Sequence, residues 1–283
     1  MKNKHVFACV LNMCKKNENY DNRTLVTEAC HEYMERIQTC SILKYGNNKL
    51  HKNIARFTLP EVVTCSASCK GCYAKKRTFH VIKKSRLKNL FIIEHAMHDD
   101  YFYNLLNITL DYELNRHVLN CREKLKLQPI MRWHDSGDIY NLRYLYFIID
   151  VAKRHSGILF YTYTKNFEVW KEYKKLKDMG FIPNNFNIVS SYIYNHVNYF
   201  DFTKNFDNEI QTLENILIKA SNDNIKIYMC NYFFDKLPSE KQAMILNLIQ
   251  KYNNTIGFNP VTSHCGLNCH ACCKYEFVIF IKH

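Results

Sequence analysis

The pattern of apolar and polar positions divides this chain into alternating strands and helices. Short runs rich in β-branched and aromatic residues predict strands, and longer stretches with apolar residues three or four positions apart predict helices. The predicted strands are 54–58, 129–133, 158–163, 187–191, 225–230 and 255–258. The predicted helices are 23–45, 85–106, 112–127, 142–154, 167–179, 208–221 and 238–252. Such alternation is typical of a parallel sheet, because each crossover helix returns the chain to the same edge.

These strand–helix units predict an α/β fold, namely a partial (β/α)6 TIM-like barrel. We expect an N-terminal helical extension at 1–48, the barrel at 49–260 and a C-terminal Cys-rich metal-binding segment at 261–283. In parallel α/β barrels, ligands bind where the strands end. Polar residues follow the predicted strands at 65–72, 134–138, 162–165, 190–191, Asn231 and Asn259, so an active site is expected on this rim.

Composition indicates one large globular domain, or one domain with small appendages. The chain has 283 residues, of which 47% are hydrophobic and 14% aromatic. Its net charge of +13 favours nucleic acid or nucleotide partners, although Lys, Asn, Ile and Tyr are abundant together and the charge also fits a solvated surface. No stretch is long enough to span a bilayer, and 6–11 is too short for a signal core, so a cytoplasmic location is expected.

The cysteines carry the strongest chemical signal. Cys65, Cys69 and Cys72 form a C-x3-C-x2-C pattern directly after the first predicted strand. Three thiolates in one loop can hold three irons of a [4Fe–4S] cluster and leave the fourth iron open to another ligand. A zinc knot and a pair of buried thiols are the alternatives.

A second pattern of the same kind lies near the C-terminus. Cys265, Cys269 and Cys272 repeat the C-x3-C-x2-C spacing, with Cys273 adjacent. These thiolates predict a second [4Fe–4S] cluster, or zinc with a neighbouring histidine completing the site. Adjacent cysteines do not easily reach one ion together, so one ligand is expected from elsewhere in the chain.

Polar residues on the rim supply further candidates. His134, Asp135 and Asp138 follow the second predicted strand and fit an acid–base or metal site, or a polar turn that caps the next helix. The remaining candidates, which fit ribose, carboxylate or phosphate groups or ordinary strand and loop positions, are Thr162, Thr164, Lys165, Ser190, Ser191 and Asn231.

The strand followed by Cys65, Cys69 and Cys72 resembles the radical S-adenosylmethionine (SAM) superfamily. The resemblance implies a partial (β/α)6 barrel, a [4Fe–4S] cluster whose open iron binds SAM, and an electron donor such as a flavodoxin or ferredoxin. The superfamily usually has an aromatic residue before the third cysteine, where this chain has Gly71 followed by Tyr73. Ser136, Gly137 and Asp138 stand where the superfamily often has Gly-Gly-Glu-Pro. By this resemblance the carboxylate of Asp138 accepts a hydrogen bond from the ammonium group of SAM, and Gly137 permits the backbone to approach SAM closely.

A narrower resemblance covers most of residues 45–200. The segments 50–60, 69–75, 132–140 and 161–165 look like a phage-encoded family known as gene product eighty-eight. It implies a phage origin, hence the cytoplasm of the host cell, and little about the substrate.

Three hypotheses follow from these patterns. The first is a radical SAM-like enzyme that acts on a nucleic acid or nucleotide. The second is a metal-stapled phage protein that binds nucleic acid without catalysis. The third is an electron carrier with two clusters, which leaves the polar rim unused.

Overall fold

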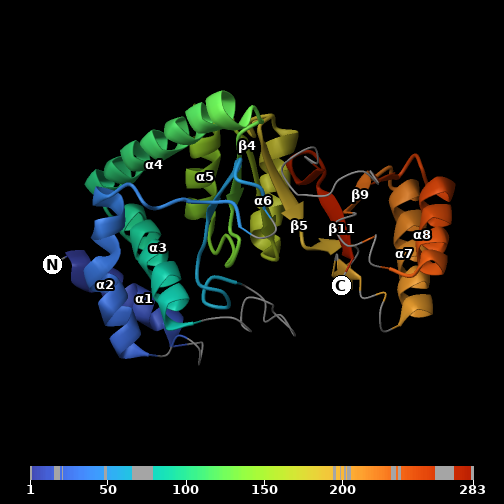
Figure 1. The fold of residues 1–283 in the computed structure, drawn as a ribbon. Helices are drawn as coiled ribbons and strands as arrows, with labels where there is room; N and C mark the ends of the chain where they lie inside the picture. The colour runs from blue at the N-terminus through green and yellow to red at the C-terminus, as the bar shows by residue number, and fades with distance from the viewer. Residues whose placement is uncertain are drawn as a thin grey trace. The chain divides into compact units, whose positions relative to one another are not determined.

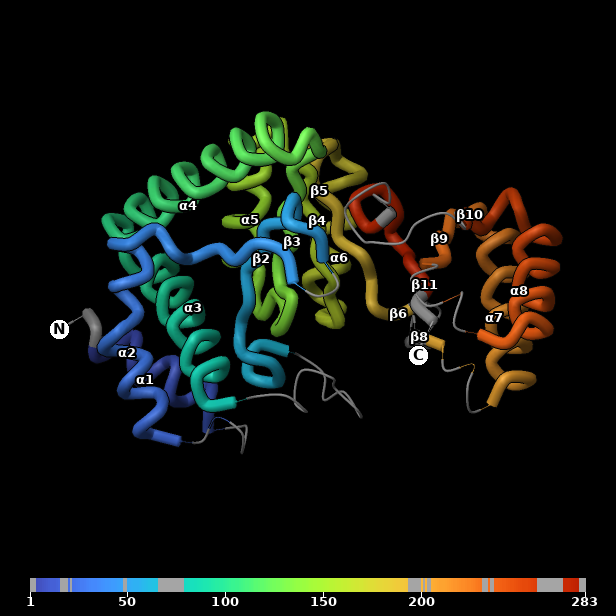
Figure 2. Tube along the Cα trace, viewed as in Figure 1, coloured from blue at the N-terminus to red at the C-terminus, as the bar shows by residue number. Residues whose placement is uncertain are grey.

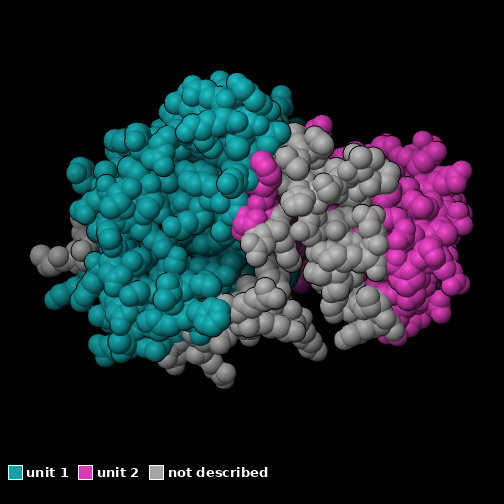
Figure 3. All heavy atoms as spheres, in the orientation of Figure 1, with its two compact units in different colours: residues 1–46, 52–160, 164–186 teal, residues 47–51, 161–163, 187–283 magenta. Residues whose placement is uncertain are grey.

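The computed structural model divides the chain into two compact units. It describes residues 2–15, 20, 22–47, 50–65, 79–193, 196–197, 199–200, 202, 205–230, 234, 237–258 and 271–281. Unit 1 comprises residues 1–46, 52–160 and 164–186, and unit 2 comprises 47–51, 161–163 and 187–283 (Figure 3). The expected segments 1–48, 49–260 and 261–283 remain a prediction.

Unit 1 combines a small sheet with helices (Figure 1). Its strands follow the order β1-β2-β3-β4, in which β1 is antiparallel to β2 and β2 is parallel to β3. The strands are β1 Lys44–Tyr45, β2 Ile54–Phe57, β3 Ile130–Trp133 and β4 Leu159–Thr164, whose central residues belong to unit 2. The helices are α1 Lys2–Cys14, α2 Arg23–Gln38, α3 His80–His98, α4 Asp100–Asn120, α5 Leu142–Arg154 and α6 Phe167–Asp178, with the π-helical turn η2 Cys121–Leu125 after α4.

Local sequence explains where these helices begin. Asn141 precedes α5 and its side chain accepts the backbone N–H of Tyr144, as an N-cap should. Asp99 does the same for α4 through the N–H of Phe102, so α4 begins at Asp100. The predicted helix boundary at 106–112 is therefore wrong. Residues 106–110 continue one helix because they contain no Gly or Pro and because Leu106 and Leu110 are buried.

The N-terminal helices of unit 1 pack on one another. α3 contacts α1, α2 and α4, and Figure 2 shows α2 lying beside α3. The largest buried side chain is Trp133 of β3, which meets Phe57 of β2 edge to face at a centroid distance of 5.6 Å. Burial of these aromatic rings stabilises the pairing of the two strands that position the candidate site.

Unit 2 contains a parallel sheet in the order β5-β11-β9-β10, with β8 paired to β11. Its apolar core includes Leu213 and Leu217 of α7 and Ile245 of α8. The strands are β5 Phe186–Ser190, β6 Tyr192–Ile193, β7 His196–Val197, β8 Tyr199–Phe200, β9 Ile227–Cys230, β10 Ile256–Phe258 and β11 Phe277–Ile281. The helices are α7 Phe206–Asn222, α8 Ser239–Lys251 and the 3-10 turn η4 Ala271–Cys273.

The predicted α/β class with a mostly parallel sheet is confirmed. The order of strands differs from that of consecutive barrel units, because β11 pairs with β5 on one side and β9 on the other. β11 was not among the strands predicted from the sequence. Among the described helices, none is both long and apolar enough to cross a membrane.

Candidate functional site

The candidate site of unit 1 lies where β2, β3 and β4 end. Because β2 and β3 run in parallel, the loops that follow them leave the sheet at the same edge. The backbone N–H of Leu59 donates to the carbonyl oxygen of Ser136 at 2.8 Å. The backbone N–H of Asp135 donates to the carbonyl oxygen of Phe57, the last residue of β2, at 3.2 Å. Two backbone hydrogen bonds therefore join the loop that leads to Cys65 to the loop of His134–Asp138.

Gly137 fixes the close approach of these loops. Its φ of +84° lies in the left-handed region, which a side chain disfavours. A Cβ atom on Gly137 would lie 2.6 Å from Cβ of Leu59 and 2.7 Å from Oγ1 of Thr64. The open face of Gly137 is therefore filled by the chain's own loop, and its predicted approach to SAM stays a prediction.

Asp138 ties the three strand ends together. Its backbone N–H donates to Oγ1 of Thr64 at 3.1 Å. Its carboxylate accepts the backbone N–H of Ile139 at 2.7 Å through Oδ1 and that of Lys165 at 2.8 Å through Oδ2. Burial raises the pKa of Asp138 to about 6, while these donors and the Thr164 hydroxyl act in the opposite direction. Asp138 thus links the chain segments that follow β2 and β3 to the end of β4, and both of its carboxylate oxygens accept backbone N–H groups. The hydrogen-bonded network of Asp138 with Thr64, Thr164 and Lys165 is here called the brace.

The brace ends at the first cysteine. The Thr64 hydroxyl donates to the carbonyl oxygen of Pro60 at 2.9 Å while it accepts from Asp138. Val62 in the same turn has a φ of +67°, a conformation that disfavours a β-branched residue by about 1–2 kcal/mol. The half-buried Cys65 follows directly. Cys69, Cys72 and Tyr73 lie outside the described residues.

A buried ion pair supports the same loop. Glu61 is 1% exposed, and its Oε2 accepts hydrogen bonds from the Tyr20 hydroxyl at 2.8 Å and from the Ser136 hydroxyl at 3.3 Å. Arg86, in α3, forms a salt bridge to the same oxygen. Glu61 and Arg86 were not among the residues predicted from the sequence. The available signal was an acidic residue between a strand and Cys65, followed by a basic residue in the next helix.

His134 and Asp135 have separate partners. The buried His134 has a φ of +61°, and its Nε2 lies 2.9 Å from the Tyr144 hydroxyl. Burial, with a smaller contribution from Arg132, lowers the pKa of His134 to about 3, so the ring is neutral at physiological pH. Asp135 forms ion pairs with Arg56 at 2.7 Å and with Arg132 at 3.6 Å. Their catalytic roles stay predictions.

The end of β4 joins the brace. The Thr164 hydroxyl accepts the backbone N–H of Asn166 at 3.0 Å and also bonds to Asp138. The amide of Asn166 donates to the carbonyl oxygen of Ile139 at 3.2 Å. Thr164, Lys165 and Asp138, which are separated in sequence, therefore meet in one polar cluster.

The other predicted rim residues belong to unit 2. The buried Thr162 donates to the carbonyl oxygen of Tyr163 at 3.4 Å. The Ser190 hydroxyl donates to the carbonyl oxygen of Tyr192 at 2.7 Å, and Ser191 is buried beside it in sequence. These contacts shape the strand ends, and binding of a cofactor there stays a prediction. Asn231 lies outside the described residues.

Cys272 lies beside aromatic side chains of unit 2. Its Sγ is 2.7 Å from the Tyr163 hydroxyl, and Asn187 donates to its carbonyl oxygen at 2.9 Å. Cys230, at the end of β9, packs against the same small apolar cluster as Cys272. Cys230 is therefore a candidate for the ligand expected from elsewhere in the chain.

The described residues include only part of the C-terminal motif. Cys273 is half-buried, and Cys265 and Cys269 lie outside the described residues. Within the described part of the chain, no group of three or more His, Cys, Asp or Glu side chains is placed to hold a metal. The metal assignments at both motifs stay predictions.

Comparison with known proteins gives one match. A family model described as Gene product 88 matches residues 39–208, which include β2, β3, β4 and the first cysteine motif. No curated protein and no solved structure matches the chain.

Proposed function

We propose that this chain, which belongs to the gene product 88 family of phage proteins, is a radical SAM-like iron–sulfur enzyme. In this proposal Cys65, Cys69 and Cys72 hold a [4Fe–4S] cluster, and the strand ends of a partial (β/α)6 arrangement form the active-site rim. The enzyme works in the cytoplasm of the host cell, takes electrons from a flavodoxin or ferredoxin, and acts on a nucleic acid or nucleotide. The net charge of +13 supports a polyanionic substrate.

The observation that carries the proposal is the brace before Cys65. Thr64 is fixed through Pro60 and Asp138, and Glu61 is fixed through Arg86. A cluster-binding loop benefits from a rigid start, because its thiolates must be held in the geometry that the metal requires. A loop that only connected a strand to a helix would not need a buried ion pair and a left-handed valine.

The donor set fits the cluster better than Asp138 fits SAM. Three thiolates at this spacing suit a [4Fe–4S] cluster, which when bound supplies the electron that splits the sulfonium of SAM. Each carboxylate oxygen of Asp138 already accepts a backbone N–H. We therefore assign Asp138 to positioning of the cysteine loop rather than to the ammonium of SAM.

Anaerobic reconstitution with iron and sulfide tests the proposal. We expect a brown protein that releases 5′-deoxyadenosine from SAM when dithionite reduces it. Cys69→Ser should abolish this release, whereas Cys30→Ser, a half-buried cysteine of α2 outside both motifs, should retain it. A colourless protein with stoichiometric zinc and no cleavage of SAM would overturn the proposal.

The metal-stapled binding protein is the second candidate, and two observations favour it. The chain is strongly basic, and the carboxylate at the expected SAM position is engaged within the protein. This candidate predicts salt-sensitive binding of nucleic acid together with a melting temperature that SAM leaves unchanged. A rise in melting temperature on addition of SAM favours the enzyme.

A further inference from the structure

Helix α4 has a second apolar face in addition to the one that it buries. The residues of this second face are Tyr101, Leu105, Ile108, Tyr112 and Leu119, here called the α4 stripe. Tyr101 is 78% exposed, Ile108 67%, Tyr112 54% and Leu119 55%, and Leu105 is partly exposed. A polar outer face is the usual arrangement for a surface helix, so exposed apolar residues in register indicate an interaction surface.

The stripe is straight and its spacing is symmetric. At 3.6 residues per turn, all of its members lie within about 40° of one line along the helix, and it extends over about 27 Å. Tyr101, Ile108, Tyr112 and Leu119 are separated by seven, four and seven positions. The spacing of these four residues is the same in both directions along the helix, and its midpoint is position 110. A second α4 running in the opposite direction would therefore present the same pattern.

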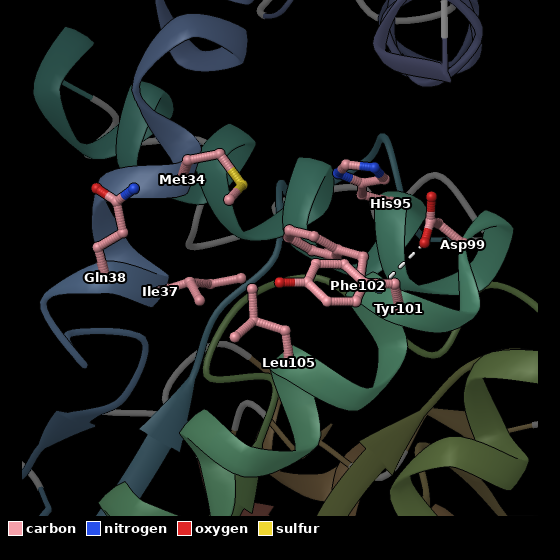
Figure 4. A pocket seen from close by; sticks show the side chains of 8 residues that line it. All are labelled: Met34, Ile37, Gln38, His95, Asp99, Tyr101, Phe102 and Leu105. Carbon is pink, nitrogen blue, oxygen red and sulfur yellow. Dashed lines mark hydrogen bonds between the residues drawn. The ribbon is translucent and has the colours of Figure 1, made fainter.

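A hollow of about 580 Å³ adjoins the N-terminal end of the stripe. Tyr101 and Leu105 line it together with side chains of α2, such as Met34 and Ile37 (Figure 4). Figure 4 shows Tyr101, Phe102 and Leu105 on one side of the hollow and the α2 side chains on the other. Its volume is large enough for an apolar side chain of a partner molecule.

We propose that two copies of this chain pair through the α4 stripe, with the two helices antiparallel about a two-fold axis that crosses the stripe at the level of residue 110. In this register Tyr101 of each copy faces Leu119 of the other, and Ile108 faces Tyr112. The hollow beside Tyr101 receives the end of the partner helix that carries Leu119. Such a two-fold contact uses the same surface on both copies, as most homodimers do.

The side chains beside the α4 stripe and the size of the contact are compatible with a second copy of this chain. The pairing sets Asn104 opposite Arg116 and Asn115 opposite Leu105, so Arg116 faces an uncharged side chain. One pair of helices is a small interface, and we expect a dissociation constant on the order of micromolar.

Sedimentation velocity of the full chain between about 1 and 100 µM tests the pairing. We expect a shift from the 33.8 kDa monomer to a dimer of twice that mass. Ile108→Glu should weaken the dimer at least about tenfold, because it buries two charges without partners. Ile218→Glu, on the 43% exposed position of α7, is the matched control and should dimerise normally. A monomer at every concentration, or a dimer that tolerates Ile108→Glu, would overturn the proposal.

A mixing experiment tests the register. Ile108→Lys and Tyr112→Glu should each be monomeric and retain the wild-type circular dichroism, because both positions are exposed. When the two variants are mixed, the antiparallel register places the opposite charges face to face, so a heterodimer should form. If each variant alone is monomeric and the mixture also stays monomeric, the antiparallel register is wrong.

Discussion

Replacement of Gly137 by alanine tests the brace that holds the cysteine loop. The added Cβ would meet Cβ of Leu59 at 2.6 Å and Oγ1 of Thr64 at 2.7 Å. The carbonyl carbon of Leu59 would lie only 3.0 Å away. The two atoms of Leu59 belong to the backbone or are bonded to it, and Oγ1 of Thr64 is held by hydrogen bonds with Pro60 and Asp138. The loop itself must therefore move to relieve the overlap.

The expected loss of stability has two parts. A left-handed φ of +84° disfavours alanine by about 1 kcal/mol. Overpacking against Leu59 and Thr64 adds about 1–3 kcal/mol. We therefore expect Gly137→Ala to lower the free energy of unfolding of unit 1 by about 2–4 kcal/mol.

Gly180→Ala is the matched control within the same unit. Gly180 has a φ of +74°, but a Cβ there would meet nothing within 4 Å. Urea denaturation of both variants, followed by circular dichroism, should show a loss of only about 1 kcal/mol for Gly180→Ala. In the reconstituted protein, iron bound per chain should fall for Gly137→Ala and stay unchanged for Gly180→Ala. Equal losses of stability in the two variants would refute the packing argument.

Three further predictions follow from the same contacts. Burial raises the pKa of Asp138 to about 6 and lowers that of His134 to about 3. Between about pH 4 and 6, Asp138 therefore makes the free energy of unfolding decrease as the pH rises, whereas His134 makes it increase. Relative to wild type, Asp138→Asn should make the free energy of unfolding increase more steeply with pH over this range, and His134→Asn should make it increase less, in denaturation curves at several pH values. Arg86→Met should destabilise unit 1 by about 3 kcal/mol because it removes the cation beside the buried Glu61, and adding Glu61→Gln to this variant should restore part of the loss. Cys230→Ser should lower the metal bound per chain, measured by mass spectrometry of the elements, but leave cleavage of SAM intact.

Local sequence signals predicted much of the fold. The helix expected at 142–154 is α5, and the strand expected at 129–133 overlaps β3. These elements were predictable because their apolar spacing and their boundary residues agree. The strand β11 was missed because its aromatic run follows a cysteine motif and its pairing with β5 and β9 depends on distant residues.

Only those residues of the candidate site that lie at strand ends were predictable from the sequence. Asp138 lies in the loop after β3 and Thr164 is the last residue of β4, so their convergence follows from a parallel sheet. The sequence shows an acidic residue before Cys65 and a basic residue in the next helix. It does not show that Glu61 and Arg86 pair, because their pairing depends on how α3 packs against the loop after β2. The close packing of Leu59 on Gly137 could not be predicted for the same reason, since only the packed structure shows Leu59 filling its open face.

The most direct test of the central claim is electron paramagnetic resonance of the dithionite-reduced protein, with and without SAM. The sample should carry serine in place of Cys265, Cys269, Cys272 and Cys273, so that the signal comes from the first motif alone. We predict a [4Fe–4S]⁺ signal whose g-values change when SAM is added, because SAM binds the open iron. A signal that SAM leaves unchanged, or no cluster signal at all, would contradict the account.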